Sequence, residues 1–141
     1  MATNANNRSN NQPNPGLVIN GQDIAELLIG SAKDDTIDGN RGNDFALLGA
    51  GNDLFIWDPG DGSDTVEGGS GRDTMQFNGS NVSENFDFSA NDDRLRFFRN
   101  VGSIVMDTNS VEHVDLNTLS GSDHVTINDL EYTDVKTINI N

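Results

Sequence analysis

Acidic side chains recur at a regular spacing through the first half of the chain. They lie nine residues apart, with one step of eleven, at Glu26, Asp35, Asp44, Asp53, Asp64 and Asp73. Carboxylates are hard oxygen ligands, and Ca²⁺ binds six to eight oxygens at about 2.3–2.6 Å, drawn from carboxylates and backbone carbonyls. Because the chain has no cysteine, thiolate metal sites and disulfides are excluded. The spacing therefore indicates cation binding by oxygen.

The best-preserved of these acids close loops that are rich in glycine. Read in nines, residues 68–76 fit G-G-x-G-x-D-x-U-x at every fixed position, where U is a large apolar residue. Residues 59–67 miss only the first glycine. Glycine accepts positive φ, so such a loop can turn several backbone carbonyls toward one point beside the aspartate.

An apolar residue follows each acid by two positions and must be buried by the element that carries it. These residues are Leu28, Ile37, Ala46, Phe55, Val66 and Met75. A three-residue strand would send this one side chain inward and its neighbours outward. A flexible Asp- and Gly-rich linker would show neither the phase nor the apolar residue. One nonapeptide can neither surround a cation nor bury its apolar side chain, so the units are expected to stack in series.

This pattern resembles the RTX, or haemolysin-type, calcium-binding repeat family over residues 21–77. The resemblance implies an all-β fold, a parallel β-roll (a β-solenoid similar to a parallel β-helix) in which two nonapeptides make one turn. Ca²⁺ ions would lie between like loops of successive turns. The loops that end in Glu26, Asp44 and Asp64 would line one edge, and those that end in Asp35, Asp53 and Asp73 the other.

The resemblance also implies about two to four calcium ions and a set of ligand positions. The favoured pairs are Asp53/Asp73 and Asp44/Asp64, followed by Asp35/Asp53, whereas the loop of Glu26 lacks inner glycines. The candidate metal-binding residues are Asp35 together with the first, third, fifth and sixth positions of four loops: Gly39, Arg41, Asn43, Asp44, Leu48, Ala50, Asn52, Asp53, Pro59, Asp61, Ser63, Asp64, Gly68, Ser70, Arg72 and Asp73.

The chain divides into three predicted segments. Residues 1–15 are expected to be a disordered polar leader, residues 16–77 the calcium-binding β-roll, and residues 78–141 a β-rich capping region that continues the solenoid. Within this region, two apolar-alternating runs flank residues 90–93, which predicts a hairpin. Residues 119–125 repeat the loop–Asp–strand pattern once. Trp57 and Asp58 interrupt the period of nine and are expected to bulge out of the roll.

Composition limits the partners and the chemistry. A net charge of −15 and a pI near 4.1 disfavour nucleic acid and anionic membrane surfaces and favour cations. No apolar run approaches the ~20 residues of a membrane span. Zinc-protease, EF-hand, phosphate-loop and nucleophile-elbow patterns are absent from the sequence. The sequence therefore predicts a binding module rather than an enzyme.

The expected role is calcium binding with folding coupled to the ion. The family resemblance implies a bacterial protein that reaches the extracellular space through a type I secretion apparatus, without a cleavable N-terminal signal peptide. Two alternatives stay open: a structural or adhesive β-solenoid that binds a glycan or surface ligand, and an accessory module of a larger secreted enzyme or adhesin.

Overall fold

The structure is a computed structural model that describes residues 15–141; most of the expected polar leader lies outside the described residues. Apart from one short 3₁₀ helix, η1 (Val101–Ser103), the regular elements are strands. They are β1 (Val18–Asn20), β2 (Leu27–Ile29), β3 (Thr36–Asp38), β4 (Phe45–Leu47), β5 (Leu54–Trp57), β6 (Thr65–Glu67), β7 (Thr74–Asn78), β8 (Asn85–Asn91), β9 (Arg94–Arg99), β10 (Ile104–Asn109), β11 (His113–Asn117), β12 (His124–Ile127) and β13 (Thr137–Ile140). The expected all-β class is confirmed.

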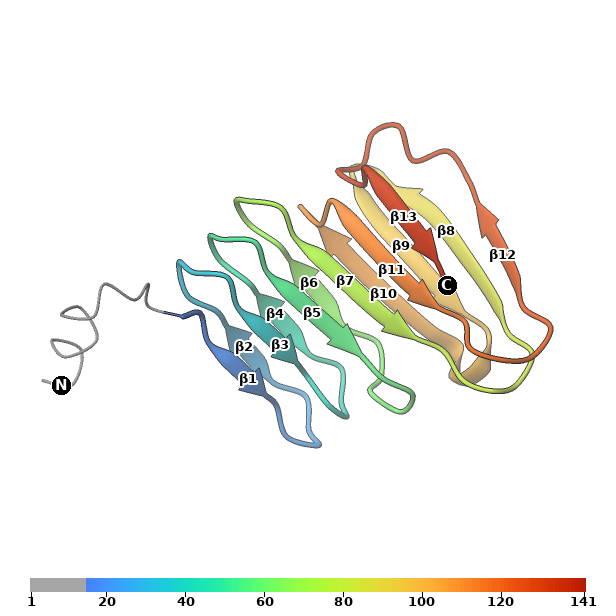
Figure 1. Cartoon of the computed structure of the whole chain (residues 1–141), viewed down its shortest axis with the longest axis horizontal. Helices are drawn as coiled ribbons and strands as arrows, with labels where there is room; N and C mark the ends of the chain where they lie inside the picture. Colours follow the sequence, from blue (N-terminus) through green and yellow to red (C-terminus); the bar gives the residue numbers. More distant parts are fainter. Residues whose placement is uncertain (1–14) are drawn as a thin grey trace, which may run out of the picture.

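The strands form two facing sheets, and the chain passes from one sheet to the other at almost every loop (Figure 1). The first sheet has the order β1-β3-β5-β7-β11-β13, and the second has the order β12-β8-β9-β10-β6-β4-β2. Through β7, each strand pairs in parallel with the strand two units later, so that Ile37 lies opposite Phe55 and Phe55 opposite Met75. Two nonapeptides therefore make one turn of a parallel roll.

The core of the roll is a thin column of single side chains. The six apolar positions of the repeat are all buried, with Leu28 the most exposed at 7%. Their strand neighbours face outward, as the period of two requires. Toward the C-terminal half the column widens into an aromatic cluster, in which the Phe77 ring lies 4.7 Å from that of Phe97.

The expected bulge at Trp57 is wrong. Trp57 is the last residue of β5, is fully buried, and stacks on Phe77 with ring centroids 4.0 Å apart. A two-residue insertion preserves the alternation of a strand, so Trp57 points to the same side as Phe55. Strand β7 is longer in the same way, which places Phe77 opposite Trp57. Only the residues after Trp57 leave the sheet.

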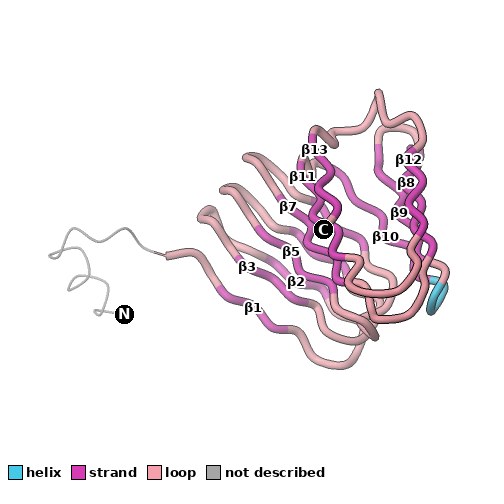
Figure 2. Tube along the Cα trace, turned by 45° about the vertical axis from the view of Figure 1, so that its right-hand side comes forward, coloured by secondary structure: helices cyan, strands magenta, loops and turns pink. Residues whose placement is uncertain are grey.

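The C-terminal half extends both sheets by a different route. The predicted hairpin is present as β8 and β9, which pair antiparallel, and β10 turns back once more to pair antiparallel with β9 and parallel with β6. Residues 128–136 then cross from β12 to β13 (Figure 2), and Leu130 and Val135 pack against the core there. At the opposite end β1 and β2 are edge strands, and Leu27 is 61% exposed.

Candidate metal centre

The loops of the roll stack into two edges, one on each side of the sheets. We call the loops that precede β2, β4 and β6 the first loop edge, and those that precede β3, β5 and β7 the second loop edge. The second strand of each parallel pair lies one turn further along, so equivalent loops of successive turns are neighbours. This places the six repeat acids on the two edges that the sequence predicts.

Four of these loops share an unusual backbone conformation. Their second and fourth residues have positive φ: Asn40 (57°) and Gly42 (127°), Gly49 (102°) and Gly51 (118°), Gly60 (109°) and Gly62 (102°), Gly69 (87°) and Gly71 (116°). Positive φ at alternate residues turns successive peptide planes, which allows backbone carbonyls of the loop to face a cation beside the aspartate. At Gly71 a Cβ atom would also overlap the Gly51 carbonyl oxygen of the preceding turn. Glycine is therefore required there by both conformation and space.

One oxygen of each loop-closing aspartate joins its loop to the preceding turn. The Asp44 amide donates to Oδ1 of Asp64 at 2.8 Å, and the Asp53 amide donates to Oδ1 of Asp73 at 2.9 Å. The same link joins Asp35 to Asp53 and Glu26 to Asp44. These bonds fix the carboxylates in place between stacked loops.

The other oxygen of the same four aspartates is buried without a donor. Oδ2 of Asp44, Asp53, Asp64 and Asp73 has no hydrogen-bond partner among residues 15–141. Each of these side chains is at most 3% exposed. A buried polar atom that lacks a partner is strongly unfavourable, more so when it carries charge. The arrangement therefore calls for a cation.

The pKa values of these carboxyls also show that the ionised form is disfavoured in the folded chain. Burial raises the pKa of Asp64 and that of Asp73 to about 7, and carboxylates of the neighbouring turn, Asp44 and Asp53 respectively, add to the rise. The pKa of Asp61 is raised to about 6, first by burial. Burial also raises the pKa values of Asp44 and Asp53. Without a cation, the folded loops resist full ionisation.

The donor set fits a hard cation that accepts backbone oxygens. Among residues 15–141, no three histidine, aspartate or glutamate side chains gather into a metal cluster. Each pair of stacked loops instead offers two aspartates beside a backbone turned by left-handed residues. Ca²⁺ accepts such a mixture of carboxylate and carbonyl oxygens.

The remaining predicted positions include residues that link the stacked loops and others that are buried or exposed along the loops. Asn43 and Asn52 accept, through Oδ1, the amides of Ser63 and Arg72 one turn later, at 2.9 and 2.8 Å. Ala50 and Ser70 form an isolated bridge between loops of the second edge. The other positions are distributed along the same four loops: Gly39, Arg41, Leu48, Pro59, Asp61 and Gly68.

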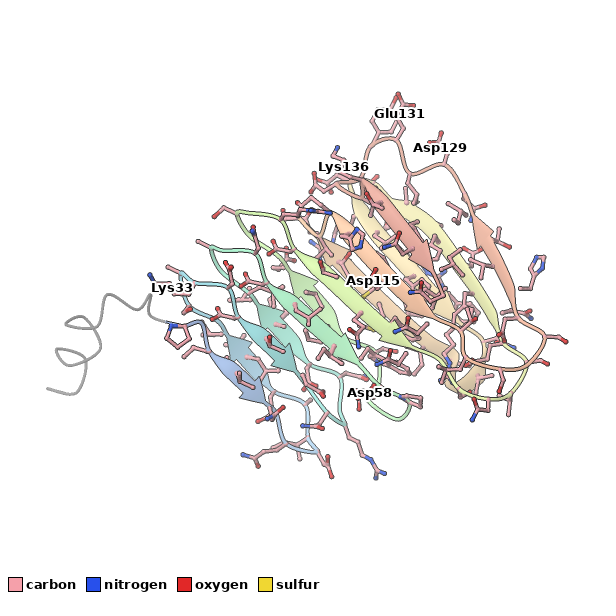
Figure 3. The ribbon with its side chains drawn as sticks, viewed as in Figure 1. Lys33, Asp58, Asp115, Asp129, Glu131 and Lys136 are labelled. Carbon is pink, nitrogen blue, oxygen red and sulfur yellow. The ribbon has the colours of Figure 1, made fainter. Side chains whose placement is uncertain are left out.

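Asp35 differs from the four aspartates because its carboxylate is fully hydrogen-bonded. Burial raises its pKa, but donation from the Ser31 amide, the Leu17 amide and the Ser31 hydroxyl outweighs burial, so the net pKa is lowered. Its loop contains no residue with positive φ, and neither does the loop of Glu26. Lys33 of the Asp35 loop is exposed at the end of the roll near the described N-terminal residues (Figure 3).

Three acids of the C-terminal half continue the loop edges. The predicted pattern at residues 119–125 contains one of them, Asp123, and none of the three is among the predicted metal-binding residues. The Asp73 amide donates to Glu112 at 2.8 Å on the second edge, and the Glu84 amide donates to Asp123 at 3.0 Å. Leu119 and Gly121, before Asp123, have φ of 65° and 124°, the conformation of the four loops above. Glu84 stands eleven residues after Asp73 and two before the buried Phe86. That spacing, already seen between Asp53 and Asp64, is the signal that could have identified it.

Comparison with known proteins agrees with this geometry. The RTX calcium-binding nonapeptide repeat matches in four copies, over residues 20–55 and 59–76. Neither the curated proteins nor the solved structures contain a significant match to the chain. In the part of the chain that the structure describes, no helix has the length and apolar character needed to cross a bilayer.

Proposed function

Because residues 20–55 and 59–76 are RTX calcium-binding nonapeptide repeats, we propose that this chain binds Ca²⁺ between stacked loops and folds as it does so. One site lies between the loops of Asp44 and Asp64, and the other between those of Asp53 and Asp73. The Asp35/Asp53 pair ranks third, since Asp35 already receives three hydrogen bonds. The proposal thus places two ions, the lower end of the two to four that the family resemblance implies.

The observation that carries this proposal is the set of four buried Oδ2 atoms without a donor. Oδ1 of each of these aspartates already accepts a backbone amide. The partner that Oδ2 still lacks is therefore proposed to be a cation. The backbone conformation of the same loops supports this assignment, since it differs from that of the Glu26 and Asp35 loops.

Coupling between binding and folding follows from the two opposing effects of the acids. Without the ion, the stacked carboxylates are desolvated and repel one another, and the roll has only a thin column of apolar side chains to oppose this. With the ion, its binding free energy becomes folding free energy. We propose that the repeats are unfolded without calcium and ordered with it.

The proposed setting is extracellular, after export by a type I secretion apparatus. Extracellular calcium modules bind with Kd on the order of 10⁻⁴–10⁻³ M, so the chain would remain loose at the low calcium of a cytoplasm and fold outside. We propose a non-enzymatic role, because cation binding already explains the buried aspartates and none of them is needed as a catalytic acid or base. The alternative of a glycan-binding solenoid gains no support from Trp57, the single tryptophan, because a sugar cannot stack on a fully buried indole.

The test is a calcium titration of the EGTA-stripped chain, followed by far-UV circular dichroism and Trp57 fluorescence. We expect a cooperative gain of β structure near millimolar Ca²⁺ and no transition with Mg²⁺, which demands octahedral geometry and dehydrates reluctantly. The variant D64N/D73N should shift the midpoint to higher calcium. A chain that is already folded in EGTA throughout its repeats, and that ignores calcium, would refute the proposal.

A further inference from the structure

Glu84 occupies the acid position of a loop that closes without a metal. Its Oε2 accepts the Ser80 amide at 2.8 Å, and its amide donates to Asp123 of the next loop. Like the aspartates of the calcium loops, its side chain is buried, with an exposed fraction of 0%. Unlike them, it has no oxygen without a partner.

The partner of Glu84 is the guanidinium group of Arg99. Nε of Arg99 lies 2.5 Å from Oε1 of Glu84, and the arginine side chain is 4% exposed. Its Nη1 donates to the Val101 carbonyl and its Nη2 to the Ser80 hydroxyl, both at 3.1 Å. The guanidinium thus binds a backbone carbonyl, a hydroxyl and a carboxylate at the loop edge, which are the kinds of oxygen that a calcium ion would take.

The strand order explains how an arginine reaches this place. Strand β9 runs antiparallel between β8 and β10, and its last residue, Arg99, points inward beside the Glu84 loop. In the parallel part of the roll, the corresponding place on an edge is the next glycine loop. The hairpin therefore sets the Arg99 guanidinium at the place where the parallel part of the roll has its next loop.

Arg99 also contacts the last calcium loop of the first edge through Trp57. The guanidinium carbon lies 5.3 Å from the centre of the Trp57 ring, and the indole N–H donates to the Gly62 carbonyl at 2.7 Å. Gly62 is the fourth residue of the Asp64 loop, where φ is 102°. The Trp57 ring thus connects the Arg99 guanidinium to the Asp64 loop, which the proposed calcium ion would order.

We propose that Arg99 is a built-in substitute for calcium that lets β8–β10 fold without the ion and serve as a template for the calcium-dependent turns. Only the second half of this inference, the template role toward the calcium-dependent turns, rests on the proposed function. The first half, folding of β8–β10 without metal, is independent of it.

Hydrogen–deuterium exchange of the full chain, read by peptide, separates the two halves. In EGTA we expect amides of residues 85–109 to be protected while those of residues 27–67 exchange as in an unfolded chain. Added Ca²⁺ should protect residues 27–67 as well. If calcium fails to protect residues 27–67, the proposed function fails, and the EGTA measurement still decides the role of Arg99.

The variant R99M tests the residue itself. Removing one partner of a buried ion pair should reduce the EGTA protection of residues 85–109 by about 100-fold or more. R96M is the matched control, because Arg96 lies on the same strand, is exposed, and has no carboxylate within ion-pair distance among the described residues. The double variant E84Q/R99M removes both charges and should recover much of the protection.

Three results would overturn the proposal. One is wild-type protein whose residues 85–109 exchange in EGTA as fast as residues 27–67. Another is R99M protein with wild-type protection in EGTA. If R99M and E84Q/R99M are equally unprotected, arginine packing rather than charge holds the loop, and the proposed cation role is rejected.

Discussion

Asp44, Asp53, Asp64 and Asp73 each have two oxygens with opposite effects on the folded chain. Oδ1 accepts an amide of the preceding turn, and Oδ2 is buried without a donor. The first stabilises the stack whether or not a metal is bound. The second destabilises it until a cation arrives. A single side chain thus supplies both the joint between turns and the unpartnered oxygen on which the proposed calcium site rests.

Asp64→Asn separates these two effects. The amide oxygen of asparagine can still accept the Asp44 N–H, while the buried charge is removed, so we expect the calcium-free fold to gain stability. The calcium-bound fold should lose stability, because one ligand charge is missing. Urea unfolding with and without calcium measures both changes. Asp35→Asn is the control, and because Asp35 is fully hydrogen-bonded it should destabilise both forms. If both variants changed the stability of the calcium-free and calcium-bound forms in the same way, the two oxygens of Asp64 would not have these separate effects.

The spacing of the sequence located the acids, but it did not predict which of their oxygens would have hydrogen-bond partners. The period of nine places Asp35 and Asp53 on an equal footing. Only the folded chain shows that Ser31 and Leu17 satisfy Asp35. The Leu17 amide makes the same 18-residue link that Asp53 receives from Asp35. The difference is Ser31, whose amide and hydroxyl donate to Oδ2 and Oδ1 of Asp35, and the nonapeptide pattern assigns no donor to that position.

Each strand of the roll buries at most two side chains, so every inward residue matters to stability. Phe55 is fully buried at the centre of β5. Phe55→Ala should destabilise the calcium-bound fold by about 3–5 kcal/mol, measured by urea unfolding at saturating calcium. Ile56→Ala is its matched control, since Ile56 is next to it and faces outward; a surface change of this kind is expected within about 0.5–1 kcal/mol. Equal losses would mean that the inward column does not carry the stability.

Element positions in the first half could be predicted because the pattern is local, whereas those in the second half required contacts distant in sequence. The hairpin at residues 90–93 was found from its turn residues. The return of β10 to pair with β6 joins residues such as Asp107 and Thr65, and no local signal predicts that choice. Arg94 reinforces it, with Glu67 at 2.7 Å and Asp107 at 2.6 Å. The same inserted hairpin brings Arg99 to Glu84.

For the whole molecule, the raised pKa values predict a calcium-free fold that prefers acid. Asp64 and Asp73 have folded pKa values of about 7, against an ordinary value of 3.8. Between these values the folded chain binds protons that the unfolded chain does not, so its stability rises as the pH falls from about 7 toward 4. Above pH 7 both carboxyls are ionised, and the calcium-free fold bears the full cost of burying their charges.

Circular dichroism of the calcium-stripped, dialysed chain at pH 5.5 and pH 8 measures this dependence. We expect more β structure at pH 5.5 and a larger response to calcium at pH 8, where protons no longer compete for the carboxylates. Lower β content at pH 5.5 than at pH 8 would show that the buried acids do not control the calcium-free fold.

The outermost strands of the first sheet, β1 and β13, lie at opposite ends of the roll (Figure 1). Tension applied through them would open the stack from an end, one turn after another, rather than shearing it all at once. A turn has 18 residues, or 20 where it spans the insertion at Trp57 and Asp58, and releases about 60–70 Å of extended chain. The turns that hold the proposed ions should resist more when those ions are bound. Pulled in an optical trap, the protein should lengthen in steps whose force rises with calcium. A single step independent of calcium would contradict this. With calcium-coupled folding as proposed, the stack of loops would also act as an elastic tether whose stiffness follows the surrounding ion concentration.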